Sequence, residues 1–190
     1  VRIDVLTRPL LAKMKAAGCY TIGFGVESGS QRILDQVIRK NLKLEKVNEV
    51  YEWCRELGVI ANPFFIISHP TETWDEAQQT LAMIRTFKED AYVSMAFLHV
   101  YPGTDLEKTA RENGTLPADF KWHQQRTDVK TLAPAQGNVP IFLDKLSWSQ
   151  ISDILFEWAG MQNFSVIRKI PKVLKSIRSV DDFVRYAVMG

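Results

Sequence analysis

Ile22-Gly-Phe-Gly-Val-Glu-Ser-Gly-Ser30 is the stretch of sequence from which the architecture follows. Apolar residues alternate with small ones up to Val26, which predicts a strand over 20–26, and a glycine-rich corner then places Glu27 at its end. Helical spacing begins at Gln31, and Ser28 and Gln31 have the spacing of a capping box. A carboxylate followed by backbone N–H groups at a strand end predicts a site for a small polar ligand, whereas the bland alternative is a turn with a helix cap.

Strand and helix patterns alternate four times through residues 1–114. Strands are predicted at 1–6, 20–26, 59–67 and 92–100, and helices at about 7–17, 31–38, 44–57, 74–87 and 105–114. The last strand is predicted to be fully buried because its apolar run is continuous. This alternation predicts an α/β fold with a parallel sheet and helical crossovers, either a barrel or a doubly wound sheet.

Both architectures bind ligands at the carboxyl ends of their strands. Glu27, His69 and His99 all fall there, and Glu72 follows His69 closely. Two histidines and a carboxylate could hold a metal ion, which leaves a metal-dependent barrel hydrolase as an alternative. Histidines that only line a pocket wall, in an enzyme or in a non-catalytic interaction scaffold, are the other readings.

The composition of the 190 residues excludes several classes of protein. A net charge of +2 gives no global argument for nucleic acid or for an anionic membrane, and no apolar run has the roughly 18–20 residues of a membrane span. Cys19 and Cys54 are far apart and form no ligand motif. Buried free thiols suit a reducing compartment, so we expect a cytoplasmic protein.

Residues 115–146 lose the strand–helix rhythm and contain several prolines, and helical patterns return from Ser147 and again from Ser179. We therefore expect two domains, an α/β domain over 1–114 and a loop-rich linker with a helical extension over 115–190. The chain starts with Val1 inside a strand-like segment rather than with Met. From this start we expect a piece of a longer protein.

Three motifs taken together resemble the radical S-adenosylmethionine (SAM) family: Gly25-Val-Glu-Ser-Gly-Ser30, Phe65-Ile-Ile-Ser-His-Pro-Thr-Glu-Thr73 and Tyr101-Pro-Gly-Thr-Asp-Leu106. They are most similar to the branch that often carries an N-terminal cobalamin-binding domain. The resemblance implies a partial (β/α) TIM-like barrel. Residues 1–114 would supply about the third to sixth of its six strands, and the N-terminal portion would be missing.

The resemblance also implies an enzyme that reductively cleaves SAM at a 4Fe–4S cluster for radical chemistry on a small-molecule substrate of unknown identity. Its reductant would be a protein such as flavodoxin or ferredoxin. Glu27 matches the residue that contacts the ribose or the methionyl part of SAM. The full set of cofactor-binding positions that the resemblance implies is Gly25, Glu27, Ser28, Phe65, Ile67, Leu98, His99 and Tyr101.

The sequence departs from the family pattern in two respects. Ser68 and Thr71 stand where the family usually has glycine, which predicts a differently shaped rim. The family's CxxxCxxC loop has no counterpart, and three closely placed thiolates are needed to hold the cluster. We expect the cluster ligands upstream of Val1, with cobalamin in a further upstream domain, so the 190 residues alone are expected to be inactive.

Overall fold

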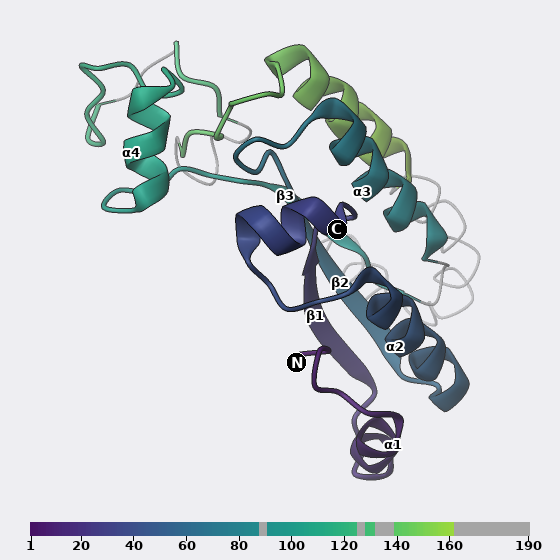
Figure 1. The fold of residues 1–190 in the computed structure, drawn as a ribbon. Coiled ribbons are helices and arrows are strands. Elements are labelled where there is room, and N and C mark those ends of the chain that lie inside the picture. Colours follow the sequence, from purple (N-terminus) through teal and green to yellow (C-terminus); the bar gives the residue numbers. More distant parts are fainter. Residues whose placement is uncertain (88–90, 125–127, 132–138, 162–190) are drawn as a thin grey trace, which may run out of the picture. The chain divides into compact units, whose positions relative to one another are not determined.

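A computed structural model describes residues 1–87, 91–124, 128–131 and 139–161 of the chain (Figure 1). The elements of the first 112 residues are α1 (Arg8–Ala16), β1 (Thr21–Glu27), η1 (Ile33–Ile38), α2 (Leu44–Leu57), β2 (Ile60–Ile67), α3 (Trp74–Thr86), β3 (Ser94–Phe97) and α4 (Asp105–Glu112). Residues 1–148 and 149–190 are two separate compact units.

The three strands of the described residues form one sheet in the order β1-β2-β3, and both pairings are parallel. Thr21 pairs with Ile60 and Gly25 with Phe64, but the register then shifts so that Glu27 lies opposite Phe65. The chain crosses from β1 to β2 through η1 and α2, and from β2 to β3 through α3. The predicted parallel α/β sheet is confirmed for these strands.

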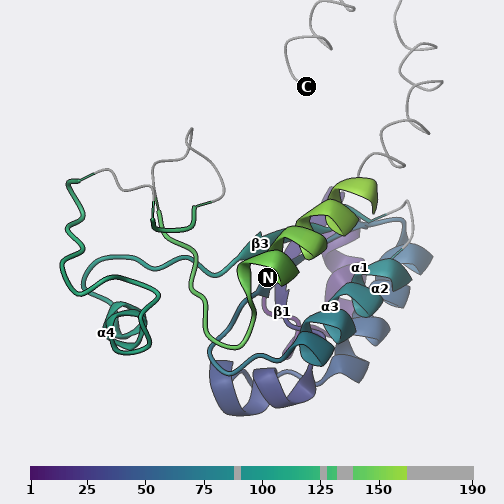
Figure 2. The same cartoon turned by 90° about the horizontal axis from the view of Figure 1, so that it is seen from above.

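The two faces of the sheet differ because successive side chains of a strand alternate in direction. The buried face carries Ile22, Phe24 and Val26 of β1 and Ala61, Phe65 and Ile67 of β2. Phe65 lies edge-on to Phe87 at the end of α3, and Phe87 also contacts Tyr51 of α2. The helices α2 and α3 therefore cover this face. Figure 1 shows α2 alongside β2, and Figure 2 shows α2 and α3 on the same side of the strands.

Helix-capping signals in the sequence correctly predicted the end of α2 and the start of α3. Gly58 ends α2 in the left-handed conformation that glycine adopts at low cost. Thr73 and Glu76 form a capping box at the start of α3, in which each side chain bonds the backbone of the other. Both helices were predicted within one residue of their observed bounds.

The predicted strand over residues 1–6 is wrong. Arg2 pairs with Asp4, and the N–H of Leu6 donates to the carbonyl of Ile3, so the segment forms a turn. Ile3 and Leu6 are buried while Val5 is 66% exposed. This spacing of three is not the alternation that a half-buried strand requires.

Two further predictions need correction. The segment from Tyr92 to Val100 contains only the short strand β3, in which Ala96 is exposed, so the strand is not buried on both faces. Ser28 does not cap the next helix, because the helical residues start at Gln31 and widen into the π-helix η1. Gln31 instead accepts the N–H of Leu44 and so caps α2.

A second cluster of buried residues surrounds α4. Its buried members are Val100, Ala110, Leu116, Phe120, Val129 and Phe142. Backbone hydrogen bonds from Phe142 to Leu98 and from Val100 to Pro140 join the segment around 140 to the chain after β3. Much of the region predicted to be loops is therefore packed on its own small core within the first unit.

Residues 148–161 are helical, in agreement with the helix predicted from Ser147, whereas the helix predicted from Ser179 lies outside the described residues. None of the helices in the described ranges has the length and apolar character that crossing a membrane requires. The division of the chain at residue 114 into two domains stays a prediction.

Candidate functional site

Glu27 ends β1 with its backbone in the left-handed conformation, at φ 74°. Its carboxylate lies back over Gly25, where an added Cβ would stand only 2.1 Å from Glu27 Oε1. Lys40 Nζ donates to Glu27 Oε1 at 2.9 Å and to the carbonyl oxygen of Gly25 at 2.6 Å. Gly25 therefore provides the space in which an acidic and a basic side chain meet at the strand end.

Lys40 reaches this place because of the way η1 ends. Arg39 adopts the left-handed conformation, and the N–H groups of Arg39 and Lys40 both donate to the carbonyl of Leu34. π-Helical turns occur often at functional sites. A cavity of about 470 Å³ adjoins Lys40 and Gly25 and is lined by residues 1–4, Gly25 and residues 38–42, while Glu27 is not among its lining residues. This volume lies within the usual range for small-molecule sites.

The three residues after Glu27 anchor the loop on α3 and do not face the cavity. Ser28 is fully buried, and its hydroxyl accepts the N–H of Ser30 and lies 3.3 Å from the hydroxyl of Thr80. The N–H of Gly29 donates to the same Thr80 hydroxyl. These N–H groups are already bonded, so they are not the anion site that the sequence suggested.

Gly29 is required here by space. A Cβ on this residue would stand 2.6 Å from the carbonyl oxygen of Gln79 and 2.7 Å from the Cα of Thr80, both in the backbone of α3. Cβ atoms in proteins essentially never come within 3.0 Å of such neighbouring atoms. The glycine of the Glu-Ser-Gly-Ser motif thus allows the loop to touch the helix.

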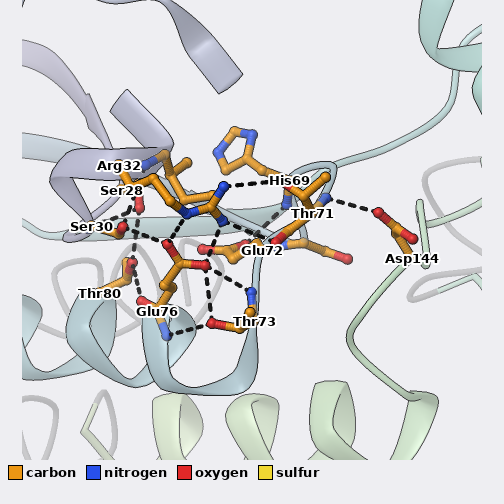
Figure 3. A network of polar contacts seen from close by, with 12 residues as sticks. Ser28, Ser30, Arg32, His69, Thr71, Glu72, Thr73, Glu76, Thr80 and Asp144 are labelled. Atoms are coloured by element: carbon orange, nitrogen blue, oxygen red, sulfur yellow. Dashed lines mark hydrogen bonds and ion pairs between the residues drawn. The ribbon is translucent and has the colours of Figure 1, made fainter. Parts of the chain in front are cut away.

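Arg32 and Glu76 extend this anchor toward the end of β2 (Figure 3). Nε and Nη2 of Arg32 donate to the two carboxylate oxygens of Glu76, and the hydroxyl of Ser30 donates to the same carboxylate. The bond from Arg32 is the largest of the effects that lower the pKa of Glu76 to about 2. Arg32 also donates to the side chain and carbonyl of Thr71, so it ties the loop after β1 to the loop after β2.

The loop after β2 contains two further residues in the left-handed conformation, Ser68 at φ 76° and Thr71 at φ 61°. Glycine adopts this conformation at little cost, whereas a β-branched residue is strained in it. These are the two positions where the sequence has side chains in place of the expected glycines. Their hydroxyls are used: Ser68 donates to the carbonyl of Phe142, and Thr71 accepts from Arg32.

Glu72 holds the backbone of this loop through its carboxylate. Its Oε2 accepts the N–H groups of Ser68 and His69 at 2.6 and 2.9 Å, while its Oε1 is buried without a partner among the described residues. The carboxyl group is fully buried, and burial raises its pKa to about 7 despite the two N–H bonds. The side chain therefore stabilises the loop at the cost of desolvating its own charge.

The other predicted positions divide into two groups. Phe65 and Ile67 are buried on the helix-covered face, so only their backbone is available at the strand end. Phe64, which is 42% exposed, and Ile66 present their side chains to the opposite face.

The predicted positions after β3 lie apart from these. Leu98 packs against the cluster around α4, and the ring centroids of His99 and Tyr101 are 6.5 Å apart. His69 is 8% exposed and adjoins this rim, although the sequence had suggested it only as a metal ligand or a wall residue.

Comparison with known proteins gives the chain its family. Residues 2–84 match the family model described as the Radical SAM superfamily. Residues 2–84 of the chain belong to the radical SAM superfamily. The matched residues include both loops that Arg32 connects.

Two relatives of this radical SAM chain are methyltransferases by name. It is 30% identical over 126 residues to the uncharacterized methyltransferase PH0819 of Pyrococcus horikoshii. The alignment covers 66% of this chain and 27% of that protein. It is 30% identical over 110 residues to the cytidylyl-2-hydroxyethylphosphonate methyltransferase of Streptomyces wedmorensis, which covers 55% of this chain and 21% of that protein. The chain thus spans about a quarter of the length of the curated relatives it matches.

The radical SAM family implies SAM and a 4Fe–4S cluster, and the residues fit these two groups differently. The carboxylate of Glu27 at the strand end suits the hydroxyl and ammonium groups of a polar cofactor such as SAM, whereas the charged side chains that line the cavity beside Lys40 are mainly basic. Cys54 is fully buried, and burial raises its pKa to about 11, so it does not suit a thiolate ligand. Within the described ranges no three His, Cys, Asp or Glu side chains are grouped to hold a metal ion. The cluster therefore does not fit these residues, and the hydrolase alternative has no support in them.

Proposed function

We propose that the full-length protein is a radical SAM enzyme that cleaves SAM reductively and that residues 1–114 contribute the part of its barrel that binds SAM. In this family a reduced 4Fe–4S cluster splits SAM into methionine and a deoxyadenosyl radical, which then takes a hydrogen atom from the substrate. The cluster ligands are proposed to lie in a part of the protein beyond these 190 residues, and the chain alone is expected not to cleave SAM. The enzyme would be cytoplasmic and would receive its electron from a protein such as flavodoxin or ferredoxin.

The geometry of Glu27 carries this proposal. A carboxylate at a strand end accepts hydrogen bonds from a ribose diol or from an ammonium group, and SAM offers both. Oε1 of Glu27 is held by Lys40 over Gly25. One carboxylate oxygen is then fixed by the protein, and we propose that the other accepts from SAM. Held in this way, the side chain orients the cofactor without ordering cost at the moment of binding.

The remaining predicted positions are assigned according to their surroundings. We propose that the backbone of Phe65 and Ile67 borders the adenine ring and that Leu98, His99 and Tyr101 close that side of the pocket. Ser28 contacts Thr80, and we propose that it supports the loop in this way rather than through a direct contact with the cofactor. These contacts bind and orient SAM and exclude water, while the bond-breaking chemistry belongs to the cofactors.

The two named relatives support a more specific outcome. Both are called methyltransferases, so they share a type of reaction. We propose that the full-length enzyme transfers a methyl group to a small-molecule substrate. Cobalamin in an upstream domain remains an expectation from the resemblance.

Replacement of Glu27 by alanine in the full-length, cluster-loaded protein tests the proposal. Loss of hydrogen bonds to a charged group, about 1.5–3 kcal/mol, should weaken SAM binding by roughly 10- to 100-fold in equilibrium binding. The iron–sulfur absorption should be unchanged, because Glu27 is not a cluster ligand. Glu52→Gln, on an exposed side chain of α2, is the matched control and should bind SAM like the unchanged protein. Unchanged affinity in Glu27→Ala would refute the assignment.

A further inference from the structure

His69 lies two residues beyond the end of β2, next to the strand end that carries Glu27. The residue is 8% exposed, and its Nε2 atom is buried. Burial lowers the pKa of the imidazole, and this effect is partly opposed by the Glu27 carboxylate and by contacts of the ring with the backbone of Ile66 and Glu27. The ring is therefore neutral at physiological pH and close to the carboxylate that is proposed to bind SAM.

The Nε2 atom of His69 is buried, and none of the described residues forms a hydrogen bond with it. Buried polar atoms nearly always have a partner, since leaving one unpaired costs about 1–3 kcal/mol. A neutral imidazole nitrogen can accept a hydrogen bond or donate one, depending on the tautomer. An unpaired nitrogen at the carboxyl end of a parallel strand, where ligands of such sheets bind, indicates a partner that the described residues do not provide.

The backbone around His69 is held in place from three directions. Glu72 accepts the N–H of His69 and that of Ser68, and Ser68 donates its hydroxyl to the carbonyl of Phe142. Arg32 and Asp144 bind the other end of the loop at Thr71. Figure 3 shows the imidazole beside this network. Because the loop is fixed before any ligand arrives, the ring is preorganised for one contact.

We propose that His69 is a ligand-contacting residue whose Nε2 forms a hydrogen bond with the nucleoside part of the molecule bound at Glu27. This inference rests on the proposed function, because the nucleoside is the adenosine of SAM. An uncharged ring is suited to this place. A protonated imidazole would repel the positively charged sulfonium, whereas the neutral ring bonds the adenosine without that cost. Glu27 and His69 would then hold the cofactor from two neighbouring strand ends.

The test compares His69→Phe with His69→Gln in the full-length, cluster-loaded protein, by equilibrium binding of SAM, 5′-deoxyadenosine and methionine. His69→Phe should weaken SAM and deoxyadenosine binding about tenfold, which corresponds to one lost hydrogen bond. Methionine binding should not change. His69→Gln keeps a hydrogen-bonding group and should recover part of the affinity.

Thermal unfolding without ligand separates binding from a structural role. The phenylalanine variant removes an unpaired buried nitrogen, so its unfolding temperature should equal or exceed that of the unchanged protein. A lower unfolding temperature together with unchanged SAM affinity would make His69 a structural residue and overturn the inference. If Glu27→Ala weakens SAM binding and neither His69 variant does, the inference about His69 fails and the proposed function stands. If Glu27→Ala also has no effect, the proposed function fails as well.

Discussion

Arg32 and Glu76 form a two-pronged ion pair, with Arg32 Nε 2.7 Å from Glu76 Oε1 and Nη2 2.6 Å from Oε2. The pair joins the start of η1 to the first turn of α3, and the same guanidinium holds the carbonyl of Thr71. Both loops of the candidate site therefore depend on one planar group. A pair of this geometry is stronger than a single contact between point charges.

Arg32→Lys should lower the free energy of unfolding by about 1–2 kcal/mol, because lysine keeps the charge but cannot make two parallel bonds. Chemical denaturation of the protein measures this loss. Arg8→Lys is the matched control, since the Arg8–Glu56 pair is about half-exposed on both sides and should change stability by less than about 0.5 kcal/mol. Equal effects of the two substitutions would contradict the role assigned to Arg32.

Glu72 should make stability fall as the pH rises. Burial raises its folded-state pKa to about 7 from 4.5, so between these values the folded state holds a proton that the unfolded state has released. Protonation therefore favours folding, and this contribution is lost as the pH rises from about 4.5 through 7. The loss amounts to about 3 kcal/mol at most.

Glu72→Gln should remove this dependence, because the amide does not titrate in that range. The measurement is denaturant stability of both proteins at several pH values between about 4.5 and 8. Glu76→Gln is a useful comparison, since the pKa of Glu76 is lowered to about 2 and its titration lies at lower pH. If the free energy of unfolding changes with pH equally in the unchanged protein and in Glu72→Gln, the buried carboxyl does not hold a proton between pH 4.5 and about 7.

Gly29→Ala should destabilise the protein by about 2–3 kcal/mol, because the new methyl group would overlap the backbone of α3. Gly103→Ala is the control. Gly103 has φ 78° but no atom within 4 Å of an added Cβ, so its substitution carries only the conformational cost of about 1 kcal/mol. Thermal unfolding compares the two. A smaller loss at Gly29 than at Gly103 would show that the loop can move off the helix.

The elements that local patterns specify were predictable from the sequence, and those that depend on distant partners were not. The bounds of α2 and α3 follow from an apolar stripe, a capping box and a terminal glycine, all of which are local. The segment 1–6 has strand-like composition, but the Arg2–Asp4 pair and the turn at Ile3 decide its conformation. Composition alone does not reveal that turn.

The candidate site shows the same division. Glu27 could be found because it follows an apolar strand and a glycine-rich corner. Its bond with Lys40 could not, since that depends on the way η1 ends. His69 was placed at the rim from the sequence only as a metal ligand or a wall residue, because an unpaired buried nitrogen becomes visible only when its neighbours are in place. The contact of Ser28 with Thr80, 52 positions along the chain, could not be predicted either.

The parallel sheet also has a consequence for how the chain reaches its folded state. Neighbouring parallel strands cannot meet through a tight turn, so β1 and β2 pair only after the 32 residues between Glu27 and Ile60 have closed into a crossover. The chain loses the entropy of closing such long segments before the stabilising contacts form, and this slows folding. The Arg32–Glu76 bond, between residues 44 positions apart, forms only once both crossovers have docked. Its formation would therefore mark a late event in the assembly of this unit.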